Sequence, residues 1–150
     1  MIWKPDVTVA AVIEREGRFL IVRERIRGRT VLNQPAGHLE DGETLLQAVV
    51  RETLEETAWA FEPEALLGLY QWRSARGHST LRIAFCGTVR DFDAARPLDP
   101  PIIATEWLTR QELAARDGAL RTPLVLRCID DYQRGTRLPL DALACLQQLQ

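Results

Sequence analysis

The chain has 150 residues, a length at which one hydrophobic core can bury well over half of the unfolded surface, so a single domain over residues 1–150 is expected. Hydrophobic residues make up 46% and charged residues 27%, a balance that excludes extensive disorder. Because the net charge is −2 and both signs are interspersed, no basic surface for nucleic acid is indicated.

The cysteines and the N-terminus indicate the cellular compartment in which the protein works. The chain has three cysteines, and they form no paired metal or redox motif. Cys86 lies in a predicted strand and Cys128 in a predicted helix, so both are expected to be small buried hydrophobic residues. Residues 1–5 lack the apolar core of a signal peptide, and no apolar run is long enough to cross a membrane. These features predict a cytoplasmic protein without membrane contact; the sequence leaves open whether it is a monomer or a homodimer.

The first half of the chain predicts three strands and one long helix. The expected strands are rich in apolar and β-branched residues and are separated by turns; they are residues 7–13, 19–22 and 30–32. Residues 34–37 break the strand pattern and are expected to form a loop. Residues 44–59 contain no Gly or Pro, and apolar residues recur there at helical spacing, which predicts a helix.

The second half predicts three more strands and several short helices. The strands are residues 66–72, 80–89 and 102–108, with a proline-rich loop at residues 91–101. Thr109 and Glu112 have capping-box spacing for a short helix. Residues 122–135 predict another helix that begins at Thr-Pro and stops at Gly, and a last short helix is expected from Asp141, with residues 147–150 fraying. This mixture predicts a layered α/β or α+β domain.

Three acids of the long helix indicate chemistry. Glu52, Glu55 and Glu56 stand at i, i+3 and i+4 and therefore share one stripe of the helix. Like charges at this spacing cost about 0.2–0.5 kcal/mol per pair, so helix stability does not explain them. A magnesium ion would explain them, because it takes oxygen ligands. From the triplet alone, a solvated charged face with Arg51 as counter-ion is the more common interpretation, because charge runs on helices are usually just solvated.

The acids also belong to a longer spaced pattern. Its fixed positions, separated by gaps of five, seven and two residues, are Gly37, Glu43, Arg51, Glu52, Glu55 and Glu56. Residues 37–59 resemble the Nudix box of the Nudix hydrolase family. Thr53 stands where the family has an apolar residue, and Ala58 replaces a late glycine, so the helix is expected to extend through that position. A loop folding back over the helix could pair Glu43 with Arg51.

The resemblance implies an α/β fold in which a mixed sheet lies between helices. It implies Mg²⁺ at the box helix, with Mn²⁺ able to replace it. The implied catalytic residues are Glu52, Glu55, Glu56 and Arg51, and the implied metal ligands are the Gly37 backbone and the same three glutamates. Glu106, at the end of a predicted strand, is a further candidate for the ligand or base, or else an exposed charge.

Several segments also resemble a bacterial phosphatase of the same family; they are residues 7–10, 33–40, 71–72, 122–125 and 132–133. This likeness implies release of inorganic phosphate from nucleoside tri- and diphosphates and from the pyrophosphate of the hydroxymethylpyrimidine precursor of thiamine. Two alternatives stay open: a pyrophosphohydrolase acting on another nucleoside diphosphate derivative, and a nucleotide-binding module without catalysis.

Four residues are candidates for contacts with such a substrate. Arg23 and Arg82 could bind phosphate, although most arginines simply face solvent. Gln34 and Trp72 could hold a ring by hydrogen bonding and stacking, although an aromatic residue in a strand more often packs against the sheet. His78 is expected to be exposed to solvent.

Overall fold

The computed structural model describes residues 1–146 of the chain. The strands are β1 Asp6–Arg15, β2 Arg18–Ile26, β3 Arg29–Asn33, β4 Ala36–His38, β5 Ala60–Arg73, β6 Ser79–Arg90 and β7 Ile102–Leu108. The helices are α1 Leu45–Thr57, α2 Arg110–Ala115 and α3 Leu124–Gln133, and short 3-10 turns lie at Asp117–Ala119 and Leu140–Ala142.

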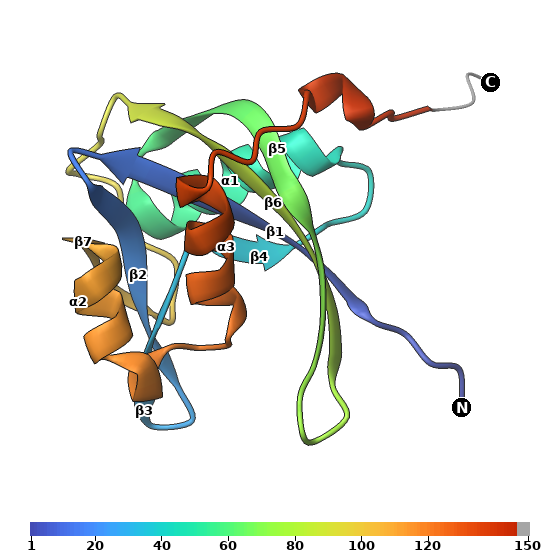
Figure 1. Ribbon diagram of the computed structural model, residues 1–150, viewed down its shortest axis with the longest axis horizontal. Helices are drawn as coiled ribbons and strands as arrows, with labels where there is room; N and C mark the ends of the chain where they lie inside the picture. The colour runs from blue at the N-terminus through green and yellow to red at the C-terminus, as the bar shows by residue number, and fades with distance from the viewer. Residues whose placement is uncertain (147–150) are drawn as a thin grey trace.

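The strands form one seven-stranded mixed sheet (Figure 1). The main path through it is β3-β2-β1-β6-β5, while β4 pairs with β1 and β7 pairs with β2. β1 and β6 run parallel, and the remaining pairs are antiparallel. β1 therefore lies between β4 and β6 at the centre of the fold.

β1 separates two hydrophobic cores, because successive side chains of a strand point to opposite faces. Val9, Ala11 and Ile13 pack in the core that α1 covers. Ala10 and Val12 pack in the core that α2 and α3 cover. Figure 1 shows α1 and α3 on opposite sides of the sheet. The predicted arrangement, a mixed sheet between helices, is confirmed.

The loop expected at residues 34–37 is present only at residues 34 and 35, because the short strand β4 begins at Ala36. Thr8 pairs with His38, and Ala10 pairs with Ala36. Nothing in the composition of these residues indicates a strand; they become one because an edge of β1 is available to them. This is a long-range effect that local propensity does not report.

The end of α1 also differs from the expectation. The helix stops at Thr57, and Ala58 adopts a left-handed conformation with φ of 62°, its N–H donating to the Leu54 carbonyl at 2.9 Å. The expectation that Ala58 extends the helix is therefore wrong. The chain must turn at once into β5, so the alanine takes the conformation that a glycine would adopt more easily.

Two further differences concern strand length and the C-terminus. β5 starts at Ala60 rather than Leu66, because Pro63 lies at a register shift where a proline is tolerated. The helix expected from Asp141 is wrong: residues 140–142 form a 3-10 turn, and residues 143–146 are not helical. Residues 147–150, where fraying was expected, lie outside the described residues.

Cys86 and Cys128 are buried, as predicted. Among residues 1–146, no helix is both long enough and apolar enough to span a membrane.

Candidate active site

The start of α1 fixes the helix against the sheet. Thr44 Oγ1 accepts from the Gln47 backbone at 3.1 Å, and Gln47 Oε1 accepts from the Thr44 backbone at 2.9 Å, which completes a capping box. Thr53 and Thr57 are buried, and each hydroxyl donates to the backbone carbonyl four residues earlier. Thr53 is thus accommodated in place of an apolar residue.

Arg51 holds the preceding loop and the acids of α1 together. Its Nε and Nη2 donate to both oxygens of Glu43, at 2.9 and 2.7 Å, so the predicted ion pair is present. Nη2 also donates to the His38 carbonyl at 3.0 Å, and Nη1 contacts Glu52 at 2.8 Å and Glu55 at 3.2 Å. The hydrogen bonds from Arg51 lower the pKa of Glu43. Arg51 is therefore a positioning residue.

Gly37 lies directly against a carboxylate of α1. A Cβ at this position would lie 2.1 Å from Cδ of Glu52 and 2.2 and 2.3 Å from its two oxygens. A side chain here would therefore displace the carboxylate, and the close backbone approach predicted for Gly37 exists. Burial raises the pKa of Glu52, against the opposing effect of Arg51.

Glu56 is the most deeply buried acid of the triplet, with 7% of its surface exposed. Its Oε1 accepts from the Ala36 N–H at 2.8 Å, which ties α1 to β4. Burial raises the pKa of Glu56 to about 9, and the nearby carboxylates of Glu24 and Glu52 contribute in the same direction. The site thus lacks positive charge, which a divalent cation would supply.

The donors around Gly37 fit a hard cation, although the side chains are not already arranged as a metal site. Among residues 1–146, no three His, Cys, Asp or Glu side chains form a group that could hold a metal ion as they stand. Nevertheless, the Glu52 carboxylate occupies the space that a Cβ at Gly37 would fill, and the carboxylates of Glu55 and Glu56 follow on the same helix stripe. Backbone and carboxylate oxygens are the ligands that Mg²⁺ prefers.

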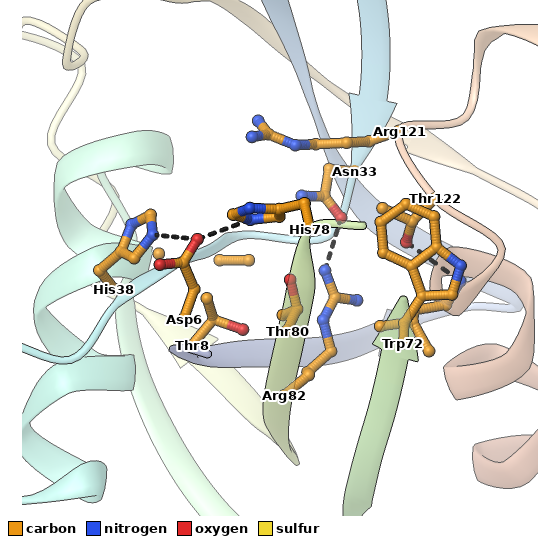
Figure 2. Close-up of a pocket in the computed structure, with 13 residues that line it drawn as sticks. Asp6, Thr8, Asn33, His38, Trp72, His78, Thr80, Arg82, Arg121 and Thr122 are labelled. Carbon is orange, nitrogen blue, oxygen red and sulfur yellow. Dashed lines mark hydrogen bonds and ion pairs between the residues drawn. The ribbon is translucent and has the colours of Figure 1, made fainter. Parts of the chain in front are cut away.

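A cavity of about 260 Å³ opens beside these residues (Figure 2). Gly37, which contacts Glu52, lines this cavity, whereas Glu52, Glu55 and Glu56 themselves do not. Figure 2 shows His38 and Asp6 at one side, Trp72 and Thr122 at the other, and Arg82 between them. A molecule in this cavity would reach from Gly37, the residue that contacts Glu52, to the aromatic surface of Trp72.

Arg82 gives the cavity wall a buried positive charge. It is 4% exposed, and it donates to Gln34 Oε1 at 2.9 Å and to Asn33 Oδ1 at 3.1 Å. Within the described part of the chain, its Nε has no hydrogen-bond partner, no acid lies at ion-pair distance from it, and the buried Thr8 hydroxyl is also unpartnered. Such groups are costly to bury unless a ligand completes their hydrogen bonds.

Two of the four expected substrate contacts, Trp72 and Arg82, line this cavity. Gln34 does not, because it is 1% exposed, its amide donates to the Val125 carbonyl at 2.7 Å, and its oxygen accepts from Arg82. Gln34 therefore lies outside the cavity and positions the Arg82 side chain through this hydrogen bond.

Arg23 and Glu106 lie away from the α1 acids. Their side chains pair at 3.7 Å, and Glu106 also pairs with Arg116 at 3.2 Å. Trp107, the next residue of β7, packs in the α1 core, so strand alternation turns Glu106 to the opposite face of the sheet. The expectations of Glu106 as ligand or base, and of Arg23 as a phosphate contact, therefore do not fit their positions.

The ion pair of Glu24 and Arg121, which lies between the α1 acids and the cavity, was not predicted from the sequence. Glu24 is buried at 5% exposure and accepts from Arg121 at 2.6 Å, and Arg121 lines the cavity. The available signal was strand alternation, which places Glu24 on the opposite face from Arg23.

His78 is exposed, as predicted, but it is not free of contacts. Its Nε2 lies 2.7 Å from Asp6, and His38 lies 3.5 Å from the same carboxylate (Figure 2). This cluster marks the mouth of the cavity.

Comparison with known proteins agrees with this geometry. The family model described as NUDIX domain matches residues 4–127. The chain is 39% identical over 141 residues to Phosphatase NudJ of Escherichia coli (strain K12), which covers 94% of this chain and 92% of that protein. A NUDIX hydrolase from Nitrosomonas europaea is 50% identical with a TM-score of 0.93, covering 95% of this chain and 98% of that one.

A more distant structure shares the fold alone. The MutT NUDIX hydrolase from Burkholderia pseudomallei is 24% identical, with a TM-score of 0.72, over 86% of this chain and 98% of that one. The family match over most of the chain and the placement of Gly37 against the α1 acids lead to one conclusion: this chain belongs to the Nudix hydrolase family.

Proposed function

We propose that this chain is a magnesium-dependent phosphatase that releases inorganic phosphate from the terminal position of nucleoside tri- and diphosphates. The observation that carries the proposal is the position of Gly37, which lies against the Glu52 carboxylate and also lines the cavity that contains Trp72 and Arg82. Support comes from the relative named Phosphatase NudJ, whose similarity extends over 94% of this chain.

The cation would be held by the Gly37 carbonyl, Glu52 and Glu56, with Glu55 as a further ligand or the base. Mg²⁺, or Mn²⁺ in its place, would offset the negative charge that develops on phosphate oxygens. The carboxylate that does not bind the cation would hold and accept the proton of the attacking water. Arg51 keeps Glu52 and Glu55 in place.

The size and lining of the cavity favour a small substrate with one ring system. Its volume of about 260 Å³ is near the lower limit for ligand sites. Trp72 offers an aromatic surface for stacking, which contributes about 1–3 kcal/mol per base in single-stranded nucleic-acid sites. The pyrophosphate of hydroxymethylpyrimidine, which also has one ring, is a second substrate to test.

Chromatography of a reaction with a nucleoside triphosphate and Mg²⁺ tests the proposal. Early nucleoside diphosphate together with phosphate is expected. Early monophosphate with pyrophosphate would show attack at a different phosphorus and would contradict it, because the pocket decides which phosphorus meets the water. If the nucleotide binds but releases no phosphate with either cation, the chain is a binding module.

A further inference from the structure

Arg121 lines the cavity from the segment that precedes α3. Its backbone N–H donates to the Leu32 carbonyl at 2.9 Å, and Leu120 forms a parallel bridge with Leu32, so this segment is held beside the end of β3. Figure 2 shows the Arg121 side chain extending across the cavity from the side of Thr122. The side chain is 43% exposed, so a molecule in the cavity can reach it.

The carboxylate of Glu24 holds one end of the Arg121 guanidinium. Glu24 Oε2 accepts from Arg121 Nη1 at 2.6 Å, and Glu24 is buried, so its charge depends on this partner. A guanidinium carries roughly five N–H donors. Within residues 1–146, Nε and Nη2 of Arg121 donate to no acceptor. These two nitrogens form one edge of the guanidinium, and that edge is free for a ligand.

This ion pair also lies close to the α1 acids. Leu20, four residues before Glu24 on β2, packs in the core that α1 covers, so strand alternation turns Glu24 toward the same face. The charges of both Glu24 and Arg121 act on the pKa of Glu56, the first raising it and the second lowering it. Arg121 therefore connects the cavity with the surroundings of the catalytic helix.

The other basic side chains that line the cavity are less available than Arg121. Arg82 is only 4% exposed, and two side-chain amide oxygens hold its guanidinium. His78 and His38 both contact the Asp6 carboxylate, at 2.7 and 3.5 Å (Figure 2). Of the two arginines in the lining, Arg121 is therefore the one whose charge is accessible.

We propose that Arg121 binds a phosphate group of the substrate and that Glu24 is the positioning residue that holds its guanidinium at the cavity. The inference rests on the proposed phosphatase function and names the residue through which that site recognises phosphate. The planar edge of a guanidinium matches the spacing of two phosphate oxygens, and such bidentate contacts are stronger than neutral hydrogen bonds. Because Glu24 takes only Nη1, the phosphate would accept from Nε and Nη2.

A double variant distinguishes a phosphate contact from a counter-ion that only stabilises Glu24. Arg121→Gln alone leaves a buried carboxylate without its partner and lowers stability. Glu24→Gln/Arg121→Gln removes both charges, so its thermal unfolding temperature should return toward that of wild type. Its kcat/KM for adenosine diphosphate at saturating Mg²⁺ should stay at least about tenfold below wild type. A double variant with wild-type kcat/KM would overturn the inference.

Two single variants serve as controls. Glu24→Gln keeps an oxygen that can accept from Arg121, so its loss of kcat/KM should be smaller than that of the double variant; an equal loss would assign the effect to Glu24 and contradict the contact. Arg127→Gln removes a partner of Asp131, another buried acid, outside the cavity lining, and should keep the wild-type kcat/KM. A tenfold loss there would show a general effect of unpairing buried acids and would also contradict the inference.

A binding measurement separates the two proposals. If no nucleotide releases phosphate, the proposed function fails, and calorimetry with adenosine diphosphate and Mg²⁺ still tests the role of Arg121. Binding to Glu24→Gln/Arg121→Gln that is at least about tenfold weaker than to wild type supports the phosphate contact. Equal binding to the two proteins, or no binding to wild type, overturns it.

Discussion

The two ends of the cavity differ in how the chain balances charge. At the α1 end, one guanidinium, that of Arg51, holds Glu43, Glu52 and Glu55, while Glu56 is buried without a cation of its own. At the β6 end, Arg82 is buried with two amide oxygens and, within residues 1–146, no acid. One end has too little positive charge and the other has unpartnered donors. A phosphorylated ring bound with a cation would satisfy both.

The largest effect is expected from breaking the α1 end. Glu56→Gln retains the shape and the hydrogen bond from Ala36, but it loses the charge that attracts the cation. We expect kcat at saturating Mg²⁺ to fall about 100-fold, on the order of 3 kcal/mol. Glu62→Gln, at an exposed position of β5, serves as the control. Turnover of Glu56→Gln within about threefold of wild type would exclude a ligand role.

A smaller effect is expected from loosening Arg51. Arg51→Lys keeps the charge but loses the bidentate contact with Glu43, so the loop and two carboxylates lose their common anchor. We expect about a tenfold loss of kcat/KM and a higher magnesium requirement. Arg110→Lys is the matched control, because Arg110 makes a similar contact with Asp130 away from the cavity. Equal effects of the two substitutions would show a general loss of stability instead.

The burial of Glu56 also predicts a pH dependence of stability when no metal ion is bound. Burial raises the pKa of Glu56 to about 9, whereas the unfolded chain loses this proton near the ordinary value of 4.5. Folding therefore retains a proton between these values. The stabilisation is complete below about pH 4.5 and is lost as the pH rises toward 9.

Thermal unfolding in EDTA from pH 5 to pH 9 measures this effect. The free energy of unfolding should decrease by at least about 1.4 kcal/mol, the equivalent of one pKa unit. The decrease should be smaller in Glu56→Gln and should be opposed by Mg²⁺ at pH 8. An identical pH profile in wild type and Glu56→Gln would show that Glu56 is not the group responsible.

The smallest effect is expected from Ala58, where a substitution changes the stability at the end of α1 but not its acidic residues. Ala58 has a positive φ of 62°, so Ala58→Gly should relieve strain and raise the free energy of unfolding by about 0.5–1 kcal/mol. Chemical denaturation measures it. Ala48→Gly, a buried position inside the same helix, should change stability in the opposite direction. A destabilised Ala58→Gly protein would contradict the interpretation of this turn.

The arrangement of the α1 acids could be predicted from sequence because it depends mainly on one helix. Glu52, Glu55 and Glu56 share a stripe through the helical repeat alone, and a loop of only a few residues brings Glu43 back to Arg51. Gly37 followed from the spacing of the same pattern. These relations involve residues near one another in the chain, so local geometry determines them.

The part of the cavity around Trp72 and Arg82 could be predicted only in part because it depends on strand pairing. Trp72 and Arg82 were correctly assigned to strands, but their shared face follows from the β5–β6 register. Glu106 appeared accessible to the acids until the pairing of β7 with β2 placed it on the opposite face. Asn33 gained a role through its contact with Arg82, 49 positions away in the chain. Local patterns do not report such long-range contacts.

The position of β1 between β4 and β6 has a consequence for substrate length. Thr8 of β1 pairs with His38, the residue after Gly37, and with Arg82 on the other side. Neighbouring strands lie about 4.8 Å apart, so two steps across the sheet separate these residues by about 10 Å. Backbone hydrogen bonds between the strands set this distance, so the sheet fixes the separation between His38 and Arg82. Molecules with a shorter or longer spacer between ring and phosphorus would engage one end and miss the other.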